Sequence, residues 1–190
     1  MVNNLGHRRA DVEGIELVGG SEKRHLELVG YDEGWVSIYL EHQARLWDVL
    51  GPAAVEVEHI GSTAVPGLAA KPIVDIVVTV DDVTAEEDYL IPLVAAGYEL
   101  RIREPGHRLV RTRAREVLIH ILQRGDQAAD NYRLLRNRLR TDADDRALYE
   151  ETKRALLQQG FDDMNAYANA KSEVIAAIME RASPDITSKP

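Results

Sequence analysis

The sequence predicts an α+β fold in which a sheet-forming region is followed by a helical segment. Residues 55–122 hold most of the β-branched and alternating apolar runs, which are typical of strands. From Gln127 onward, apolar residues recur at helical spacing instead. With 45% hydrophobic and 29% charged residues, a chain of 190 residues can bury one sizeable core. The expected divisions are a single domain over 23–182, made of a sheet-containing part (23–126) and a helical part (127–182), and flexible tails over 1–22 and 183–190.

Six segments have strand composition, being rich in β-branched residues or alternating in hydrophobicity. We expect strands over His25–Val29, Val55–Ile60, Ile73–Val80, Tyr98–Arg103, Arg108–Arg113 and Glu116–Leu122, with a weaker one near Ile15–Val18. The third segment is apolar almost throughout, which is typical of a strand covered on both faces. A carboxylate in such a strand is costly unless it has a partner, so Asp75 is the strongest candidate for a functional residue.

Five segments favour helices. We expect them over Trp35–Leu50, Asp82–Ala96, 128–140, 144–159 and 162–181. Glycine ends or separates several of these segments, at Gly51, Gly97 and Gly160. In the last two helices, Lys153 and Lys171 each follow a tyrosine by four positions, which puts each pair on one helix face. These lysines either reach water beside packed rings or neutralise a bound phosphate.

The charge distribution restricts the partners. A net charge of −9 disfavours broad non-specific nucleic-acid binding, because most of the surface would repel a phosphate backbone. Between positions 101 and 124, however, seven arginines stand against two glutamates. This basic island suits a compact anionic ligand, and recognition of RNA such as a tRNA end is a further alternative. Equally, the arginines can be solvated strand positions paired with acidic helices.

Other classes are excluded by what the composition omits. The absence of cysteine excludes disulfides, zinc–cysteine sites and thiol catalysis. The N-terminal residues have no apolar core of a signal peptide, and no run approaches the roughly 20 apolar residues that span a bilayer. We therefore expect a cytoplasmic protein that does not enter the membrane.

A loop of small residues joins the strands predicted at 55–60 and 73–80. Its Gly61-Ser62 turn is suited to phosphate, because glycine lets backbone N–H groups and the neighbouring hydroxyl approach phosphate oxygens closely. Lys71 can add a positive charge beside the turn. This is not a Walker A loop, because leucine rather than Lys-Ser/Thr follows Gly67.

The string from Glu58 to Pro72, EHIGSTAVPGLAAKP, followed by Asp75, resembles the signature of the GrpB family, a branch assigned to the nucleotidyltransferase (polymerase beta-like) superfamily. The resemblance covers about residues 25–180 and includes Tyr31-Asp32, Trp35, Gly97-Tyr98, His120, Arg138, Leu139, Tyr149, Lys153, Tyr167 and Lys171. It implies a nucleotidyltransferase-like mixed β-sheet flanked by helices, with a pocket bounded by the Gly-Ser turn and the strands of Asp75 and His120. It further implies binding of a nucleotide or another phosphorylated small molecule, and transfer of a nucleotidyl group to a small acceptor.

The resemblance and the residue types together give each candidate a role. Asp75 and His120 are the candidate catalytic residues, and Asp75 is also the candidate ligand of Mg²⁺ or Mn²⁺. The candidate ligand-binding residues are His59, Gly61, Ser62, Thr63, Lys71, Lys153 and Lys171.

Val77 stands where the superfamily carries the second aspartate of Asp-x-Asp, on the same strand face as Asp75. One carboxylate with His120 makes a weak Mg²⁺ site, because Mg²⁺ prefers oxygen ligands, so a transition metal or a metal-free site is an alternative. The same departure favours a second class of function, a non-catalytic nucleotide- or metabolite-binding or regulatory module.

Overall fold

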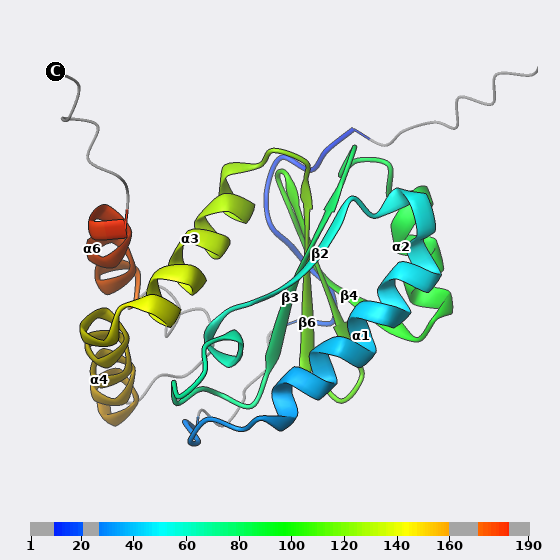
Figure 1. The fold of residues 1–190 in the computed structure, drawn as a ribbon. Helices are drawn as coiled ribbons and strands as arrows, with labels where there is room; N and C mark the ends of the chain where they lie inside the picture. Colours follow the sequence, from blue (N-terminus) through cyan, green and yellow to red (C-terminus); the bar gives the residue numbers. More distant parts are fainter. Residues whose placement is uncertain (1–9, 21–26, 160–170, 183–190) are drawn as a thin grey trace, which may run out of the picture.

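The computed structural model describes residues 10–20, 27–159 and 171–182, and a six-stranded sheet lies at its centre (Figure 1). The strands follow the order β1-β4-β5-β6-β3-β2 across the sheet. Their bounds are β1 Glu16–Leu17, β2 Glu56–Ile60, β3 Val74–Val80, β4 Tyr98–Glu104, β5 His107–Thr112 and β6 Val117–Gln123. The pair β3–β6 runs parallel and the other neighbouring pairs run antiparallel, so the sheet is mixed as expected.

Helices cover both faces of this sheet. Their bounds are α1 Gly34–Leu50, α2 Glu86–Ala95, α3 Gln127–Thr141, α4 Ala143–Gln159 and α6 Ser172–Ala182, with 3₁₀ turns η1 Gly51–Ala53 and η2 Ser62–Ala64. Helices α1 and α2 lie on one face, and α3, with α4 and α6 beyond it, lies on the other (Figure 1). The predicted α+β class, with a mixed sheet flanked by helices, is confirmed.

The predicted strands agree with the structure to within one residue at each end for β2, β3, β4, β5 and β6. The weak strand expected near 15–18 is present as β1, which pairs with β4. The strand expected over 25–29 falls partly outside the described residues, and Val29 forms an isolated antiparallel bridge with Ala70. The helix expected over 162–181 falls partly outside the described residues, which contain α6 over Ser172–Ala182, and the proposed breaker Gly160 also lies outside them.

Helix α2 corrects one prediction, because it begins at Glu86 rather than at Asp82. The Asp82 carboxylate accepts hydrogen bonds from the backbone N–H of Thr84, at 2.9 Å, and from its hydroxyl, at 2.6 Å. Aspartate side chains that bond to the backbone two residues on hold a turn, which competes with helix. The chain therefore turns here before the helix starts.

Strand β3 is covered on both faces, as its composition predicts. Val74, Ile76, Val78 and Val80 pack into the main core with α1 and α2. On the other face, Val77 packs with Ile60 of β2, Leu122 of β6 and Ala129 of α3. Asp75 therefore projects toward the side of the sheet that α3 covers.

The arginines between 101 and 124 mainly contact carboxylates and backbone carbonyls. Arg108 is 2% exposed and donates to Glu86, at 2.7 Å, and to Asp11, at 2.7 Å. Arg103 shares the same glutamate, and Arg124 pairs with Asp81. These contacts favour the paired interpretation of the basic island over recognition of an external anion.

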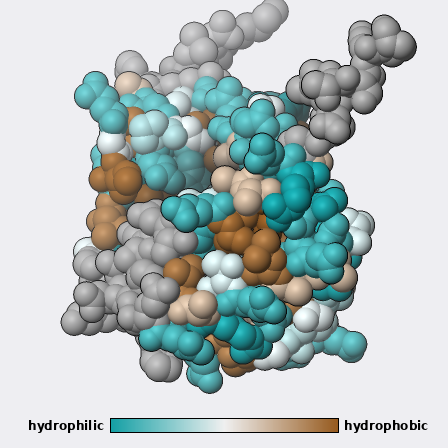
Figure 2. Space-filling view, turned by 90° about the vertical axis from the view of Figure 1, so that its left-hand side faces the viewer, coloured by the Kyte–Doolittle hydropathy of each residue, from teal (hydrophilic) through white to brown (hydrophobic). Residues whose placement is uncertain are grey.

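The side of the molecule that carries α4 and α6 is mostly hydrophilic (Figure 2). On this face, hydrophobic side chains gather near the centre and at the left edge of the view. Within the described ranges, no helix combines the length and the apolar character that crossing a membrane requires.

Candidate functional site: a lysine-lined pocket

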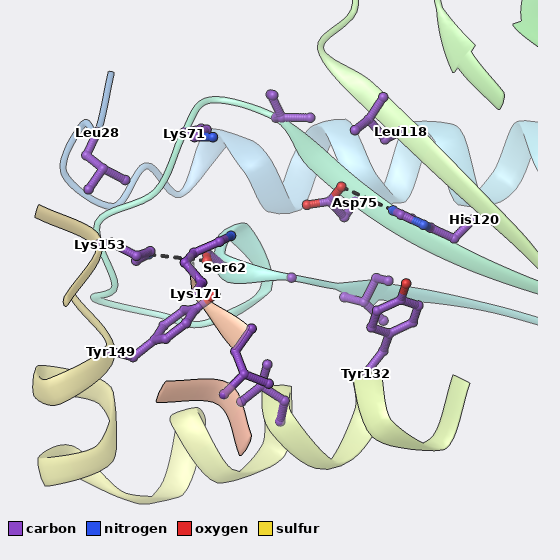
Figure 3. A pocket seen from close by; sticks show the side chains of 15 residues that line it. Leu28, Ser62, Lys71, Asp75, Leu118, His120, Tyr132, Tyr149, Lys153 and Lys171 are labelled. Atoms are coloured by element: carbon purple, nitrogen blue, oxygen red, sulfur yellow. Dashed lines mark hydrogen bonds and ion pairs between the residues drawn. The ribbon is translucent and has the colours of Figure 1, made fainter. Parts of the chain in front are cut away.

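A cavity of about 330 Å³ lies between the sheet and the helices on the α3 side (Figure 3). Its lining residues are Leu28, Ile60, Gly61, Ser62, Lys71, Ile73, Asp75, Leu118, His120, Tyr132, Leu135, Tyr149, Lys153, Lys171 and Ile175. Seven of the nine predicted site residues are in this set. The structure therefore brings together the glycine-serine turn, the strand carboxylate and lysines from distant parts of the chain.

His59 and Thr63 are the two predicted residues that do not line this cavity. The His59 ring stacks on Tyr39, with 4.7 Å between ring centroids. The Thr63 hydroxyl donates to the Ile73 carbonyl at 3.2 Å, and its oxygen lies 3.0 Å from His59 Nε2, which donates to it. Burial lowers the pKa of His59 to about 4, so the ring is neutral at physiological pH. Both side chains hold the loop between β2 and β3 in place.

Lys153 of α4 is the most buried cation of the pocket, at 2% exposure. Its Nζ donates to Ser62 Oγ, at 3.2 Å, and to the Ala69 carbonyl, at 2.5 Å, and lies 4.8 Å from the centre of the Tyr149 ring. Burial, followed by the nearby charge of Lys171, lowers the pKa of Lys153 to about 7. A bound anion would favour the charged form and raise this pKa again.

The helical part of the chain holds the loop as well as lining the pocket. One turn before Lys153, the Glu150 carboxylate accepts a hydrogen bond from the Ala69 backbone N–H at 2.9 Å. Arg140 of α3 donates to the Ala64 carbonyl at 2.8 Å. Helices α3 and α4 thus fix the position of the same loop whose turn faces the cavity.

Asp75 and His120 face each other from the adjacent parallel strands β3 and β6. His120 Nε2 lies 3.5 Å from Asp75 Oδ1. The predicted alternation along β6 is confirmed, because His120 lines the pocket while Ile119 and Ile121 lie in the core on the opposite face. The other ring nitrogen of His120 lies 3.2 Å from Nε2 of His107 on β5.

Gly61 lies directly against Asp75, and a substitution there has a predictable cost. Its φ of +71° is in the left-handed region, and an added Cβ would lie 2.6 Å from Asp75 Oδ2. We expect Gly61→Ala to lower the free energy of unfolding by about 1–3 kcal/mol, from backbone strain and from this clash. Denaturant unfolding measures the change. Gly67→Ala is the matched control, because Gly67 has a φ of +79° but no atom within 4 Å of an added Cβ. Equal losses in the two variants would contradict the close contact with Asp75.

The donor set around Asp75 does not fit a two-metal site. Val77, in the place of a second carboxylate, is fully buried among apolar side chains. Glu58, which pairs in register with Val77, is bound to two arginines of α3. Across the part of the chain that the structure describes, no group of three or more His, Asp or Glu side chains is arranged to hold a metal ion. Mg²⁺ and Mn²⁺ prefer several oxygen ligands, and among these residues only Asp75 has a carboxylate that faces the pocket.

Comparison with known proteins identifies the family. The family model described as GrpB protein matches residues 25–181. The chain belongs to the GrpB family. A UPF0157 protein of Streptomyces coelicolor is 60% identical to this GrpB-family chain over 182 residues, which cover 96% of this chain and 97% of that protein. A UPF0157 protein of Halalkalibacterium halodurans is 38% identical over 92% of each chain.

Structural similarity agrees with this assignment to the GrpB family. The crystal structure of the conserved protein GrpB from Enterococcus faecalis matches with a TM-score of 0.72 and 30% identity, covering 82% of this chain and 96% of that chain. A shorter match is to a dephospho-CoA kinase from Mycolicibacterium paratuberculosis, which is 40% identical over 76 residues. These residues make up 38% of this chain and 19% of the kinase. The place of the chain in the nucleotidyltransferase superfamily stays a prediction.

The sequence analysis gave no role to Tyr132, which lines the pocket of this GrpB-family chain, or to His107, which contacts the pocket residue His120. Tyr132 of α3 lines the pocket, and burial, with Asp75 adding to it, raises its pKa to about 12, so that the phenol keeps its proton. The sequence does contain a signal for the position of His107. Pro105-Gly106 is a typical two-residue turn, and such a turn places Glu104 of β4 opposite His107 of β5.

Proposed function

We propose that the pocket binds a nucleotide or another phosphorylated small molecule, with the phosphate beside Ser62. One observation carries the proposal: Lys71, Lys153 and Lys171, from three separate segments, line one cavity in which Asp75 is the only carboxylate among the lining residues. The cationic groups outnumber the anionic one, which favours anions. Ammonium groups and a hydroxyl form charge-assisted hydrogen bonds with phosphate oxygens.

The remaining walls suit the rest of such a ligand. Ile60, Leu118 and Leu135 supply apolar surface, while His120 and Tyr132 supply polar groups. A volume of about 330 Å³ is near the lower end of the roughly 300–1,000 Å³ typical of ligand sites. The proposed ligand is therefore small.

The finer proposal is transfer of a nucleotidyl group from a nucleoside triphosphate to a small acceptor. In this reaction the acceptor hydroxyl gives its proton to His120 or Asp75, its oxygen bonds to the α-phosphorus, and pyrophosphate leaves. The position of Asp75 on the strand that follows the Gly61-Ser62 turn supports this proposal. Release of pyrophosphate from a triphosphate, abolished by Asp75→Asn, is the expected result.

A second candidate function is a binding or regulatory module without catalysis. The burial of Val77 and the arginine contacts of Glu58 favour it, because both remove a second metal-binding carboxylate. Ligand binding without any release of pyrophosphate would support this alternative.

Phosphate binding itself is tested by a thermal-shift screen of ATP, UTP, coenzyme A, dephospho-CoA and inorganic pyrophosphate. A compound that binds the folded state and not the unfolded chain raises Tm. The coenzymes are included because of the likeness to part of a dephospho-CoA kinase. If none of these compounds shifts Tm at concentrations up to millimolar, the proposal is wrong.

Anion affinity is expected to fall as the pH rises through 7. The pKa of Lys153 in the ligand-free protein is about 7, so its side chain is mostly charged at pH 6 and mostly neutral at pH 8. Because an anion binds the charged form, the apparent Kd for sulfate should rise about tenfold between these pH values. Sulfate is the probe because its own charge is constant over this range. Calorimetry in two buffers should also detect proton uptake on binding at pH 8, and a flat pH profile would contradict the role of Lys153.

A further inference from the structure

A chain of polar side chains crosses the strands beside the pocket. The Glu104 carboxylate, at the end of β4, accepts a hydrogen bond from Nδ1 of His107 on β5. His107 Nε2 lies 3.2 Å from His120 Nδ1, and the two ring planes differ by 12°. His120 Nε2 then lies 3.5 Å from Asp75 Oδ1 inside the pocket (Figure 3).

This geometry fixes where the protons lie when both rings are neutral. An ionised carboxylate can only accept, so His107 Nδ1 carries a proton and its Nε2 is bare. The bare Nε2 accepts from the Nδ1–H of His120, which leaves His120 Nε2 without a proton. The pKa of His107 is lowered, first by burial, and burial favours the neutral ring.

The result is a pair of acceptors inside the pocket. In this tautomer His120 Nε2 and Asp75 Oδ1, 3.5 Å apart, both present lone pairs and have no proton between them. Such a pair is satisfied when a donor group of a ligand lies beside both atoms. Figure 3 shows Asp75 and His120 toward one side of the pocket, and Lys153, Lys171 and Tyr149 toward the other.

We propose that Glu104 and His107 are positioning residues that hold His120 in the Nδ1–H tautomer, so that His120 Nε2 and Asp75 together accept one three-centre hydrogen bond from a hydroxyl group of the ligand. With a phosphate at the lysine side, the ligand is a phosphorylated compound that carries a hydroxyl group. This ligand class rests on the proposed function, whereas the tautomer does not.

The tautomer is read directly by long-range ¹H–¹⁵N correlation spectra of the histidine side chains at pH 8. Wild-type His120 should show a protonated Nδ1. In His107→Phe, which removes the acceptor, His120 should change to the Nε2–H form and donate to Asp75. His107→Gln should restore the Nδ1–H form, because the amide oxygen can accept in place of the ring nitrogen. His42, which lies 2.8 Å from the Tyr98 hydroxyl, is the internal reference and should not change.

A second variant covers the case in which His107→Phe does not fold. Glu104 is the last residue of β4 and its side chain is 36% exposed, so Glu104→Ala is expected to fold and to leave His107 and His120 as mixtures of tautomers. An Nε2–H form of His120 in the wild type would overturn the positioning role. An unchanged Nδ1–H form in His107→Phe, or in Glu104→Ala where His107→Phe does not fold, would overturn it too.

The ligand class is tested separately with two probes, glycerol 3-phosphate and n-propyl phosphate, which differ in their hydroxyl groups. Calorimetry should give a Kd about tenfold lower for glycerol 3-phosphate, and His107→Phe, or Glu104→Ala in its place, should reduce the difference. Equal binding of the two probes would overturn the hydroxyl inference. Binding of neither probe would overturn the hydroxyl inference together with phosphate binding, while the spectra would still decide the role of His107.

Discussion

Lys153→Met is expected to weaken the binding of phosphate-bearing ligands about 10- to 100-fold while the protein stays folded. The variant removes a charged donor that faces Ser62 and the cavity, and hydrogen bonds to charged groups contribute about 1.5–3 kcal/mol each. Methionine keeps a similar length and is apolar, so it suits a side chain that is 2% exposed. Isothermal titration with ATP or pyrophosphate measures the loss.

Arg154→Met is the matched control for this variant. Arg154 follows Lys153 on the same helix, but it is about half exposed and pairs with Glu150. At pH 6, where Lys153 is mostly charged, the two variants lose nearly the same net charge, whereas the place of the charge differs. We expect Arg154→Met to bind within about twofold of the wild type, since exposed pairs contribute little. Equal weakening in both variants would mean that net charge, and not the pocket, governs binding.

Lys153 also makes the free energy of unfolding depend on pH, and its lowered pKa sets the direction of this dependence. The pKa of Lys153 is lowered from 10.5 to about 7 in the folded protein, so between these values the unfolded chain binds more protons. The contribution of Lys153 to the free energy of unfolding therefore rises with pH from about 7 to 10.5. Lys153→Met should remove this slope. Its overall stability should change by no more than about 2 kcal/mol, because relief of the buried charge offsets the lost donor to the Ala69 carbonyl.

Val77→Asp is expected to lower the free energy of unfolding by about 3–5 kcal/mol, the largest effect on stability among the changes considered. The new carboxylate would replace a fully buried side chain that packs with Ile60, Leu122 and Ala129, none of which can donate from its side chain. An uncompensated buried charge costs about this much. Urea unfolding, monitored by circular dichroism, measures it.

Val77→Asn separates the charge from the shape, because asparagine has nearly the same size and no charge. We expect its loss to be smaller, about 1–3 kcal/mol. The urea unfolding of both variants is also measured in the presence of Mn²⁺. No recovery is expected for Val77→Asp, because Glu58 stays bound to its arginines. If Mn²⁺ restored the free energy of unfolding of Val77→Asp and not that of Val77→Asn, one replacement would be enough to create a metal site. That result would contradict the conclusion that the residues around Asp75 do not fit such a site.

The local features of the site were predictable. The strand of Asp75 was recognisable from its β-branched residues, and the turn at Gly61-Ser62 from the special backbone freedom of glycine. Alternation along β6 placed His120 opposite the core face, and the structure confirms this. The start of α2 was misplaced by four residues, because a side chain-to-backbone turn at Asp82 competed with the helix.

The sequence by itself determined the α+β class, the strand of Asp75 and the loop that faces the pocket, because periodicity and turn chemistry are properties of neighbouring residues. The family resemblance implied a pocket between the Gly-Ser turn and the strands of Asp75 and His120, and the tertiary structure decided the contacts within it and beside it. Lys153 reaches Ser62 across 91 positions of the chain, and His107 meets His120 because β5 pairs with β6. It also decided that His59 holds the loop while His120 lines the cavity. Such contacts depend on how helices pack on the sheet and how strands pair, which no local pattern specifies.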